Sequence, residues 1–204
     1  MRYKWLYREK REKLIIFFNG WGMDESVVKH LNPEKYDILM FYDYNTLETE
    51  FDFSQILQYK EIYLVAWSMG VMVATLFDKI KYKSKTAING TLFPIHNKYG
   101  IPERIYDLTL KNFNSEGAKK FIKNMFLEPA FLTSVSRKFE EQKSELLALR
   151  GYRANTDFKY DRIIISSEDK IIPSKHQSEY WGIEPNLKAG HAPFNCFKNW
   201  SELL

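Results

Sequence analysis

Short β-like runs alternate with helical patterns along most of this chain. Runs of four to six residues occur at 14–18, 36–41, 62–66, 85–89 and 162–165, and several end in a loop signal. Mostly apolar runs of this length are typical of strands that are buried on both faces of a parallel sheet. Strands that alternate with helices predict an α/β fold with a mostly parallel central sheet and helices on both faces.

Residues 101–150 interrupt this alternation because they contain no β-like run. Their apolar residues recur at helical spacing, so we interpret the segment as several helices inserted between two strands, forming a helical cap. The cap would belong to a single domain that spans residues 1–204, since a chain of this length with 45% hydrophobic residues suits one core. The residues that define the helical spacing are Ile105, Leu108, Leu110, Phe121, Met125, Phe126, Phe139, Leu146 and Leu149.

The chain carries a formal net charge of +4. This mild excess is either ordinary surface charge or a local basic patch that meets an acidic partner, and no nucleic-acid-binding motif accompanies it. No apolar run approaches the roughly 20 residues that span a membrane, and the charged N-terminus is unlike a signal peptide. A single cysteine, Cys196, excludes an internal disulfide. We therefore expect a cytoplasmic protein that binds neither membranes nor nucleic acid.

The run at 62–66 leads directly into Ser68, and a helical pattern follows at 71–80. Small residues, Ala66 and Gly70, stand two positions before and two positions after this serine. Such a pattern is typical of a nucleophile elbow, a strained strand-to-helix turn that exposes one hydroxyl above a sheet. We expect the flanking residues to be small because larger side chains would collide across the turn. The alternative is a serine that only caps the helix.

A nucleophilic serine needs a neighbouring base, and His191 is the candidate. It follows Gly190 on a loop near the C-terminus, before a proline-started helix. Chain order favours it, because this architecture runs from nucleophile to acid to histidine. The alternative is a surface loop histidine. The other histidines of the chain are His30, His96 and His176.

Asp169 is the candidate acid. It lies in a polar turn after the run at 162–165, where a carboxylate can orient the histidine and stabilise its charged form. Glu168 is the rival, but its longer side chain is expected to point outward. The alternative interpretation of Asp169 is a solvated turn aspartate.

Residues 19–22, Asn-Gly-Trp-Gly, follow the run at 14–18. In the hydrolase architecture this loop supplies one amide of an oxyanion hole, and the residue after the nucleophile supplies the other. We therefore predict that the backbone N–H groups of Trp21 and Met69 form the oxyanion hole. The alternative is a tight glycine-rich turn before a helix that Asp24 caps. A phosphate-binding loop is less favoured, because no Gly-Lys-Ser/Thr ending follows.

These motifs resemble those of the α/β-hydrolases over most of the chain, and more narrowly those of BioG-type pimeloyl-acyl-carrier-protein methyl ester esterases of biotin synthesis. The matching stretches are 18–24, 66–70, 89–91, 100–102 and 190–194, together with Pro94. Two departures from the general hydrolase pattern are Asn19, where many members have histidine, and Ala66, which replaces the first glycine of the elbow. Alanine is still small, so neither departure removes the chemistry.

The resemblance implies a serine esterase that hydrolyses the methyl ester of pimeloyl-acyl carrier protein and needs no cofactor or metal. Ser68 would attack the ester carbonyl, His191 would transfer the proton, and Asp169 would orient His191. Two alternatives remain: an acyl thioesterase or small-ester hydrolase with the same triad, and a non-catalytic binding protein with a hydrolase fold.

Acyl carrier proteins are acidic, so the resemblance also implies a basic docking face. The alternative is an ordinary solvated helical face, since Glu116, Glu140, Glu141 and Glu145 are interspersed. The candidate cations of the cap are Arg104, Lys111, Lys119, Lys120, Lys123, Arg137, Lys138, Lys143, Arg150 and Arg153.

Overall fold

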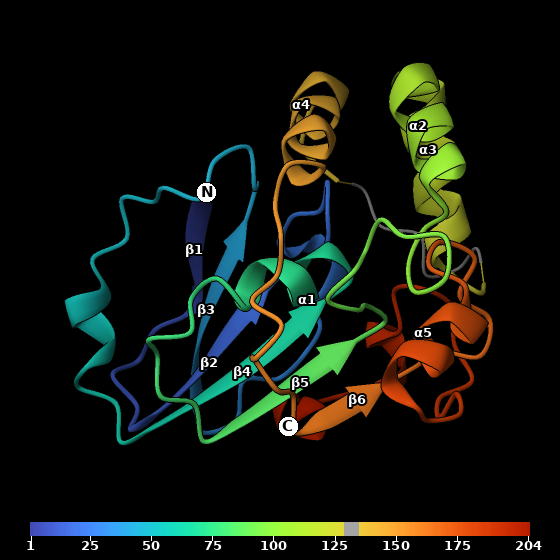
Figure 1. The fold of residues 1–204 in the computed structure, drawn as a ribbon. Coiled ribbons are helices and arrows are strands. Elements are labelled where there is room, and N and C mark those ends of the chain that lie inside the picture. The colour runs from blue at the N-terminus through green and yellow to red at the C-terminus, as the bar shows by residue number, and fades with distance from the viewer. Residues whose placement is uncertain (129–134) are drawn as a thin grey trace.

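The predicted strands lie side by side in one six-stranded sheet (Figure 1). The structure is a computed structural model that describes residues 1–128 and 135–204. Along the sheet the strand order is β1-β3-β2-β4-β5-β6, with β2 to β6 parallel. The strands are β1 (Arg2–Tyr7), β2 (Lys13–Phe18), β3 (Tyr36–Tyr42), β4 (Glu61–Trp67), β5 (Ser84–Ile88) and β6 (Arg162–Ile164).

Strand β1 was not predicted from the sequence. It pairs antiparallel with β3 at the edge of the sheet, with Arg2 opposite Tyr42 and Trp5 opposite Leu39. Its first half is exposed, and charged residues at an exposed edge discourage pairing with another chain. Because those charges interrupt the apolar pattern, the segment lacks the signal by which the buried strands were recognised.

The parallel register brings the carboxyl ends of the central strands to one edge of the sheet. Phe18, at the end of β2, lies opposite Ala66 of β4, and Ala66 lies opposite Ala87 of β5. The loops that follow these strands therefore start close together. In open parallel sheets this edge is where ligands bind.

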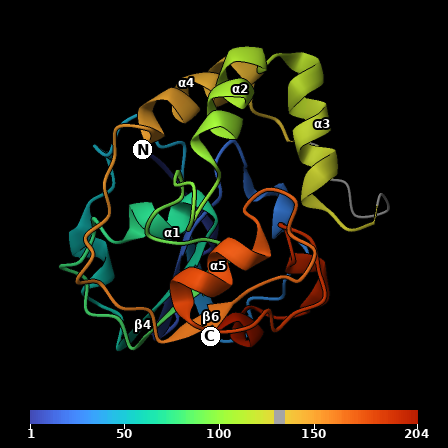
Figure 2. The same cartoon turned by 45° about the vertical axis from the view of Figure 1, so that its right-hand side comes forward.

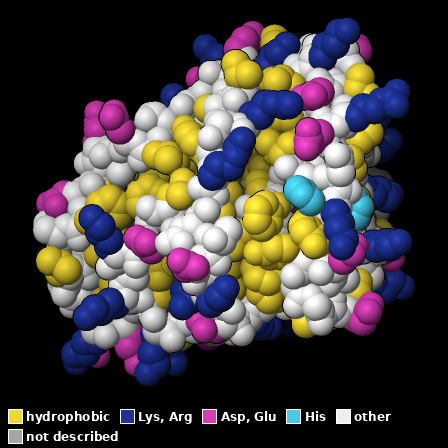
Figure 3. All heavy atoms as spheres, in the orientation of Figure 1, with side chains coloured by type: hydrophobic (Ala, Val, Ile, Leu, Met, Phe, Trp, Pro, Cys, Tyr) yellow, Lys and Arg dark blue, Asp and Glu magenta, His cyan; other side chains and the backbone are white. Residues whose placement is uncertain are grey.

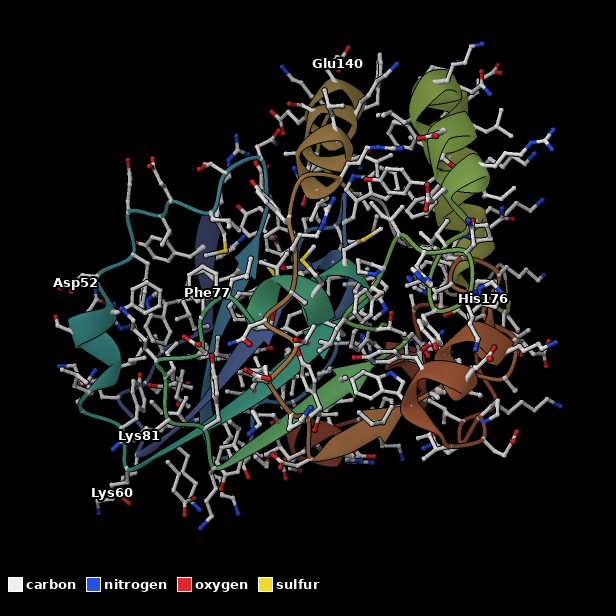
Figure 4. All side chains as sticks on the ribbon, in the orientation of Figure 1. Asp52, Lys60, Phe77, Lys81, Glu140 and His176 are labelled. Carbon is white, nitrogen blue, oxygen red and sulfur yellow. The ribbon has the colours of Figure 1, made fainter. Side chains whose placement is uncertain are left out.

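Helix α1 (Met69–Ala74) is shorter than the helical pattern at 71–80 predicted. After Thr75 the chain continues in turns, and Phe77 packs beside Phe41 and Phe53 at the sheet edge (Figure 4). The hydroxyl of Thr75 also bonds to the Met72 carbonyl, inside its own helix. The apolar residues after Thr75 thus face the core from a loop rather than from a helix.

Among the described residues, three helices lie between β5 and β6, where the sequence predicted an inserted helical segment. They are α2 (Glu103–Asn112), α3 (Ser115–Met125) and α4 (Phe139–Leu149). Figures 1 and 2 show them beyond the carboxyl ends of the strands, with α2 and α3 side by side. Part of the predicted segment, residues 129–134, lies outside the described residues.

Helices cover the two faces of the sheet unequally. Helix α1 packs on one face, in the cluster that contains Phe18 and Phe41. On the other face 3-10 turns bury Val27, Phe194 and Trp200 in the cluster that contains Phe17, and the end of α3 adds Met125 to the same cluster. These turns are η1 (Glu25–Val27), η4 (Phe194–Cys196) and η5 (Trp200–Leu203), while η2 (Phe53–Ile56) lies near the β1 edge and α5 (Ser174–Trp181) follows β6. Within residues 1–128 and 135–204, no helix has the length and apolar character to cross a membrane.

Candidate active site

Ser68 lies in the turn between β4 and α1 in a strained backbone conformation, with φ 56° and ψ −124°. Positive φ is rare for a residue other than glycine and accumulates at functional sites. A Cβ atom on Gly70 would come within 2.4 Å of the Phe18 carbonyl oxygen and 2.6 Å of that of Asn19. The small residue after the serine is therefore required by the end of β2, rather than by a collision across the turn as the sequence suggested.

Ser68, His191 and Asp169 lie in one hydrogen-bonded chain. The Oγ atom of Ser68 is 2.8 Å from Nε2 of His191, and Nδ1 of His191 is 2.7 Å from Oδ2 of Asp169. All three residues are buried. This geometry connects a hydroxyl to a base and the base to a carboxylate, as nucleophilic catalysis by serine requires.

The carboxylate of Asp169 is held on both oxygens. Its Oδ1 accepts the backbone N–H groups of Ile171 and Ile172, at 2.8 and 3.0 Å. Its Oδ2 accepts the side-chain amide of Gln177, at 2.9 Å, besides the His191 ring. Glu168, the rival, is exposed, as its longer side chain suggested. The buried Gln177 was missed in the sequence because an isolated glutamine eight positions after the acid carries no recognisable signal.

Asn89 joins the acid turn to the histidine loop. Its Nδ2 atom donates to Oγ of Ser166 at 2.7 Å and to the His191 carbonyl at 2.9 Å, and its Oδ1 accepts the Ser166 N–H at 2.7 Å. The indole of Trp67 donates to the same His191 carbonyl at 2.8 Å. Asn89 has φ 45°, a left-handed conformation that asparagine tolerates better than most residues. The sequence identified Asn89 only as part of a family motif.

The remaining histidines bond to backbone groups elsewhere. His30 Nε2 is 2.9 Å from the Phe194 carbonyl oxygen, and His176 Nδ1 is 2.8 Å from that of Gly100. His176 lies on α5 (Figure 4). His96 Nδ1 accepts the backbone N–H groups of Lys98 and Tyr99. Of the four histidines, His191 is the one that bonds to the elbow serine.

The loop at 19–22 starts beside the elbow, with its amide groups held in fixed directions. Oδ1 of Asn19 accepts the Gly20 N–H at 2.9 Å, and its Nδ2 donates to the Asp24 carbonyl at 2.9 Å. The asparagine that departs from the hydrolase pattern thus braces the loop. Across the described part of the chain, neither the Trp21 nor the Met69 N–H donates to a protein acceptor. That these two N–H groups form the oxyanion hole stays a prediction.

Asp24 caps the short helix after this loop, as predicted. Its Oδ1 accepts the Ser26 N–H at 3.0 Å, and its Oδ2 accepts both the N–H and the hydroxyl of Ser136 at 2.7 Å. Burial works to raise the pKa of Asp24, but the hydrogen bonds from Ser26 and Ser136 outweigh it and hold the pKa below its ordinary value. The Asp24 side chain therefore also connects the loop at 19–22 to Ser136, in the segment before α4.

An apolar groove runs between α2 and α3, and its lining includes Trp21 of the loop at 19–22 and Ile171, two positions after Asp169. Its volume is about 330 Å³, within the range of small-molecule sites. Ile105 and Leu108 of α2, which the helical spacing marked as apolar, remain about half exposed along it. Other lining residues include Phe113, Phe121 and Lys120.

Two of the predicted surface charges of the cap are buried. Arg137 bonds to Oε2 of Glu145 at 2.6 Å and lies 3.1 Å from Oδ1 of Asp43. Burial raises the pKa of Glu145, while the Arg137 guanidinium and the Tyr44 N–H oppose that rise. Arg137 is thus unavailable to a docking partner, and Glu145 does not belong to a solvated face. Among the described residues, no cluster of His, Cys, Asp or Glu is arranged to hold a metal ion.

Known proteins are similar to this chain in sequence and in structure. The crystal structure of BioG from Haemophilus influenzae superposes with a TM-score of 0.89 and 35% identity, over 100% of this chain and 99% of that one. An esterase from Exiguobacterium antarcticum superposes with a TM-score of 0.66 at 15% identity, over 93% of this chain and 87% of its own, which shows the α/β-hydrolase fold alone.

A third similarity covers only part of a longer protein. A malonyl-[acyl-carrier protein] O-methyltransferase from Bacteroides fragilis is 38% identical over 186 residues, which are 84% of this chain but 37% of that protein. The family model described as "Pimeloyl-ACP methyl esterase BioG" matches residues 1–203 of this chain. The chain therefore belongs to the BioG family, an esterase family with the α/β-hydrolase fold.

Proposed function

We propose that this protein is a serine esterase in which Ser68 is the nucleophile, His191 the general base and Asp169 the residue that orients the base. The observation that carries the proposal is the chain of hydrogen bonds from Ser68 Oγ through the His191 ring to Asp169. The strained backbone of Ser68 supports it, since strain of this kind is characteristic of nucleophile elbows.

In the first half-reaction Ser68 Oγ forms a bond to the ester carbonyl carbon as its proton passes to Nε2 of His191. The carbonyl electrons move onto oxygen, and the N–H groups of Trp21 and Met69 stabilise this charge. The bond to the alkoxy group then breaks, and His191 returns the proton to the departing alcohol. In the second half-reaction His191 takes a proton from water, which attacks the acyl-enzyme carbonyl. The bond from the acyl carbon to Ser68 Oγ then breaks, and His191 returns the proton to Oγ, which releases the acid.

For the substrate we propose the methyl ester of pimeloyl-acyl carrier protein, so that the leaving alcohol is methanol. The family description supports this choice. The Bacteroides fragilis relative supports it independently, because its name describes an enzyme that methylates the acyl group of malonyl-acyl carrier protein. A methyltransferase of that kind makes a carrier-bound methyl ester, and a linked esterase segment is chemically suited to remove it later.

The groove between α2 and α3 is the proposed path of the acyl chain. Its apolar lining suits the methylene chain of a dicarboxylic acid. Trp21, which lines it, belongs to the loop at 19–22, which we call the oxyanion loop. Lys120 and Lys170 lie along the same groove. These cations suit the phosphate of a carrier arm, which enters from outside while the distal ester reaches Ser68.

The proposed carrier-docking face is formed by basic side chains of α2 and α3. Figure 3 shows Lys and Arg side chains gathered over these helices. Arg104, Lys111, Lys119, Lys120 and Lys123 are exposed there. Arg150 pairs with Asp107 and is a weaker candidate. Electrostatic docking of this kind mainly accelerates association with an acidic partner.

Mass spectrometry of the carrier protein tests the proposal directly. Purified enzyme is incubated with pimeloyl-acyl carrier protein methyl ester, and the intact carrier is weighed. Ester cleavage removes only the methyl group, whereas thioester cleavage frees the carrier from the whole acyl chain. We expect demethylation by the wild-type protein and a loss of roughly four to six orders of magnitude in Ser68→Ala.

Each alternative has its own result. Release of the free carrier faster than demethylation would identify an acyl thioesterase. Failure of a fluorophosphonate probe to label Ser68 would favour a non-catalytic binding protein. Complementation of a strain blocked at this esterase step, by wild type but not by Ser68→Ala, would connect the activity to biotin synthesis.

A further inference from the structure

Helix α4 places two buried side chains against the oxyanion loop. Gln142 and Glu145, three positions apart on one helix face, both point toward Gly22, the residue that follows the proposed donor Trp21. We call these two side chains the α4 clamp. By contrast Glu140, near the start of the same helix, is exposed and points away from the molecule (Figure 4).

The α4 clamp holds both polar groups of Gly22. Oε2 of Glu145 accepts the Gly22 N–H at 3.1 Å, and Nε2 of Gln142 donates to the Gly22 carbonyl at 2.9 Å. The backbone carbonyl of Gln142 accepts the indole N–H of Trp21 at 2.7 Å. Gly22 has φ +73°, a left-handed conformation in which the chain reverses direction. Helix α4 therefore holds the loop immediately after the Trp21 amide.

A second path runs from Glu145 to the start of the loop. Oε1 of Glu145 accepts the Tyr44 N–H at 2.9 Å, and the Tyr44 hydroxyl donates to the Asn19 carbonyl at 2.7 Å. Burial raises the pKa of Tyr44 well above its ordinary value, so the phenol remains a hydrogen-bond donor. The loop is thus held at both ends by groups that meet at one buried carboxylate.

The direction of the Trp21 N–H depends on these contacts. A trans peptide is planar, so the Trp21 N–H points opposite to the Gly20 carbonyl, which accepts the Met23 N–H at 3.3 Å. That bond closes a turn whose two central residues are Trp21 and Gly22. A shift of Gly22 therefore moves Met23 and rotates the peptide plane that carries the Trp21 amide.

We propose that Glu145, assisted by Gln142, is a positioning residue that fixes the oxyanion loop so that the Trp21 amide faces the reacting carbonyl. This inference rests on the proposed function, in which Trp21 is an oxyanion donor. Glu145 does not touch the substrate, and it acts through Gly22 and Tyr44. Because it lies on α4, it also makes the oxyanion hole depend on the placement of an inserted helix.

A carboxylate suits this position better than a neutral side chain. Glu145 accepts bonds from Gly22, Tyr44 and Arg137. A glutamine there presents one oxygen and one NH₂ group, so one of the two backbone N–H groups would face another donor. Arg137 lies between Glu145 and Asp43, and Arg2 also pairs with Asp43, so two cations face the two buried carboxylates.

The test compares Glu145→Gln with Asp37→Asn. Asp37 is an equally buried carboxylate that accepts two backbone N–H groups, those of Glu9 and Arg11, at the opposite end of the sheet. Both variants remove a buried charge, but only one contacts the oxyanion loop. Gln142→Met, which keeps the side-chain volume and removes the bond to Gly22, is a milder second variant that tests the clamp even where Glu145→Gln fails to fold.

Two rates are measured: kcat and KM for methyl ester hydrolysis, and the rate at which a fluorophosphonate labels Ser68. The phosphoryl oxygen of that probe occupies the oxyanion hole, so labelling reports on the hole without a carrier protein. We expect Glu145→Gln to lower kcat and labelling about 10- to 100-fold with KM nearly unchanged. Gln142→Met should lower them by a smaller factor, and Asp37→Asn should leave both rates near wild type.

Labelling by both clamp variants at the wild-type rate would overturn the proposal, as would an equal loss in Asp37→Asn. Failure of the proposed function has a different signature. If the wild-type protein is labelled at Ser68 but leaves the carrier-bound methyl ester intact, the proposed substrate is wrong. The labelling rates of the variants still decide the role of Glu145 in that case. A wild-type protein that takes up no probe overturns both.

Discussion

The Oγ atom of Ser68 lies 2.8 Å from Nε2 of His191, although the two residues are 123 positions apart in the chain. Ser68 is held by the strained turn after β4, and His191 by the carbonyl bonds from Asn89 and Trp67. The contact therefore joins two loops at the carboxyl edge of the sheet. Each element that holds one of these loops affects the reaction in a way that mutation can measure.

Asp169→Asn should lower kcat by about 10⁴-fold, because an amide no longer stabilises the charged histidine or selects its tautomer. Steady-state hydrolysis of a methyl ester measures the effect. Glu168→Gln is the matched control, since that neighbour is exposed, and it should keep wild-type kcat. Equal losses in the two variants would contradict the assignment of Asp169.

Gly70→Ala should destabilise the protein by about 1–3 kcal/mol and lower kcat, because the new Cβ would meet rigid backbone at the end of β2. Urea unfolding and kcat are measured together. Gly182→Ala is the contrast: its φ of +71° is strained for alanine, but no atom lies within 4 Å of the new Cβ. That variant should lose about 1 kcal/mol with an unchanged kcat.

Asn89→Asp should lower kcat at least tenfold and reduce the free energy of unfolding by about 2 kcal/mol. The substitution keeps the shape and the left-handed backbone but turns the donor that serves Ser166 and His191 into an acceptor. Asn186→Asp is the control, because Asn186 bridges the backbone of Ile163 in β6 and of Ile165 just after it in a similar way but is exposed. A normal kcat in Asn89→Asp would show that the histidine loop does not need this bridge.

Asp24→Asn should cost about 1–3 kcal/mol at pH 7, and this cost should vary with pH. The folded-state pKa of Asp24 lies below its ordinary value. Its stabilising effect is therefore complete above the unfolded-state pKa of about 3.9 and disappears as the pH falls through the folded-state pKa. Urea unfolding at several pH values should show a constant difference between wild type and variant from pH 7 to about 5 and a shrinking difference below about 4.

Asp52→Asn is the control for this pH dependence. Asp52 caps η2 through Ser54 as Asp24 caps η1 through Ser26, but it is exposed. Its substitution should have a smaller effect on unfolding and none on kcat. A difference between wild type and Asp24→Asn that grows as the pH falls below 4 would contradict the direction of the pKa shift.

Much of the fold and of the candidate site was predictable from local patterns. The buried strands appear as apolar runs because both faces of a parallel sheet are covered, and the elbow appears as small residues around Ser68 because β2 ends against Gly70. Strand β1 was missed because an exposed edge needs no apolar run. Helix α1 was predicted too long because the residues after Thr75 are apolar for packing rather than for helix formation.

The sequence by itself determined the residue types and their order: a serine in a strand-to-helix turn, then an acid, then a histidine, with the motifs of one esterase family. Only the tertiary structure decided which polar groups meet. It selected Asp169 over Glu168 as the carboxylate that bonds to His191, joined Asn89 and Gln177 to the same cluster, and buried Glu145 against Gly22 with Arg137 as its ion-pair partner. The physical reason is that strand and helix patterns reflect local burial, whereas hydrogen bonds between distant loops depend on the register of the sheet that brings the loops together.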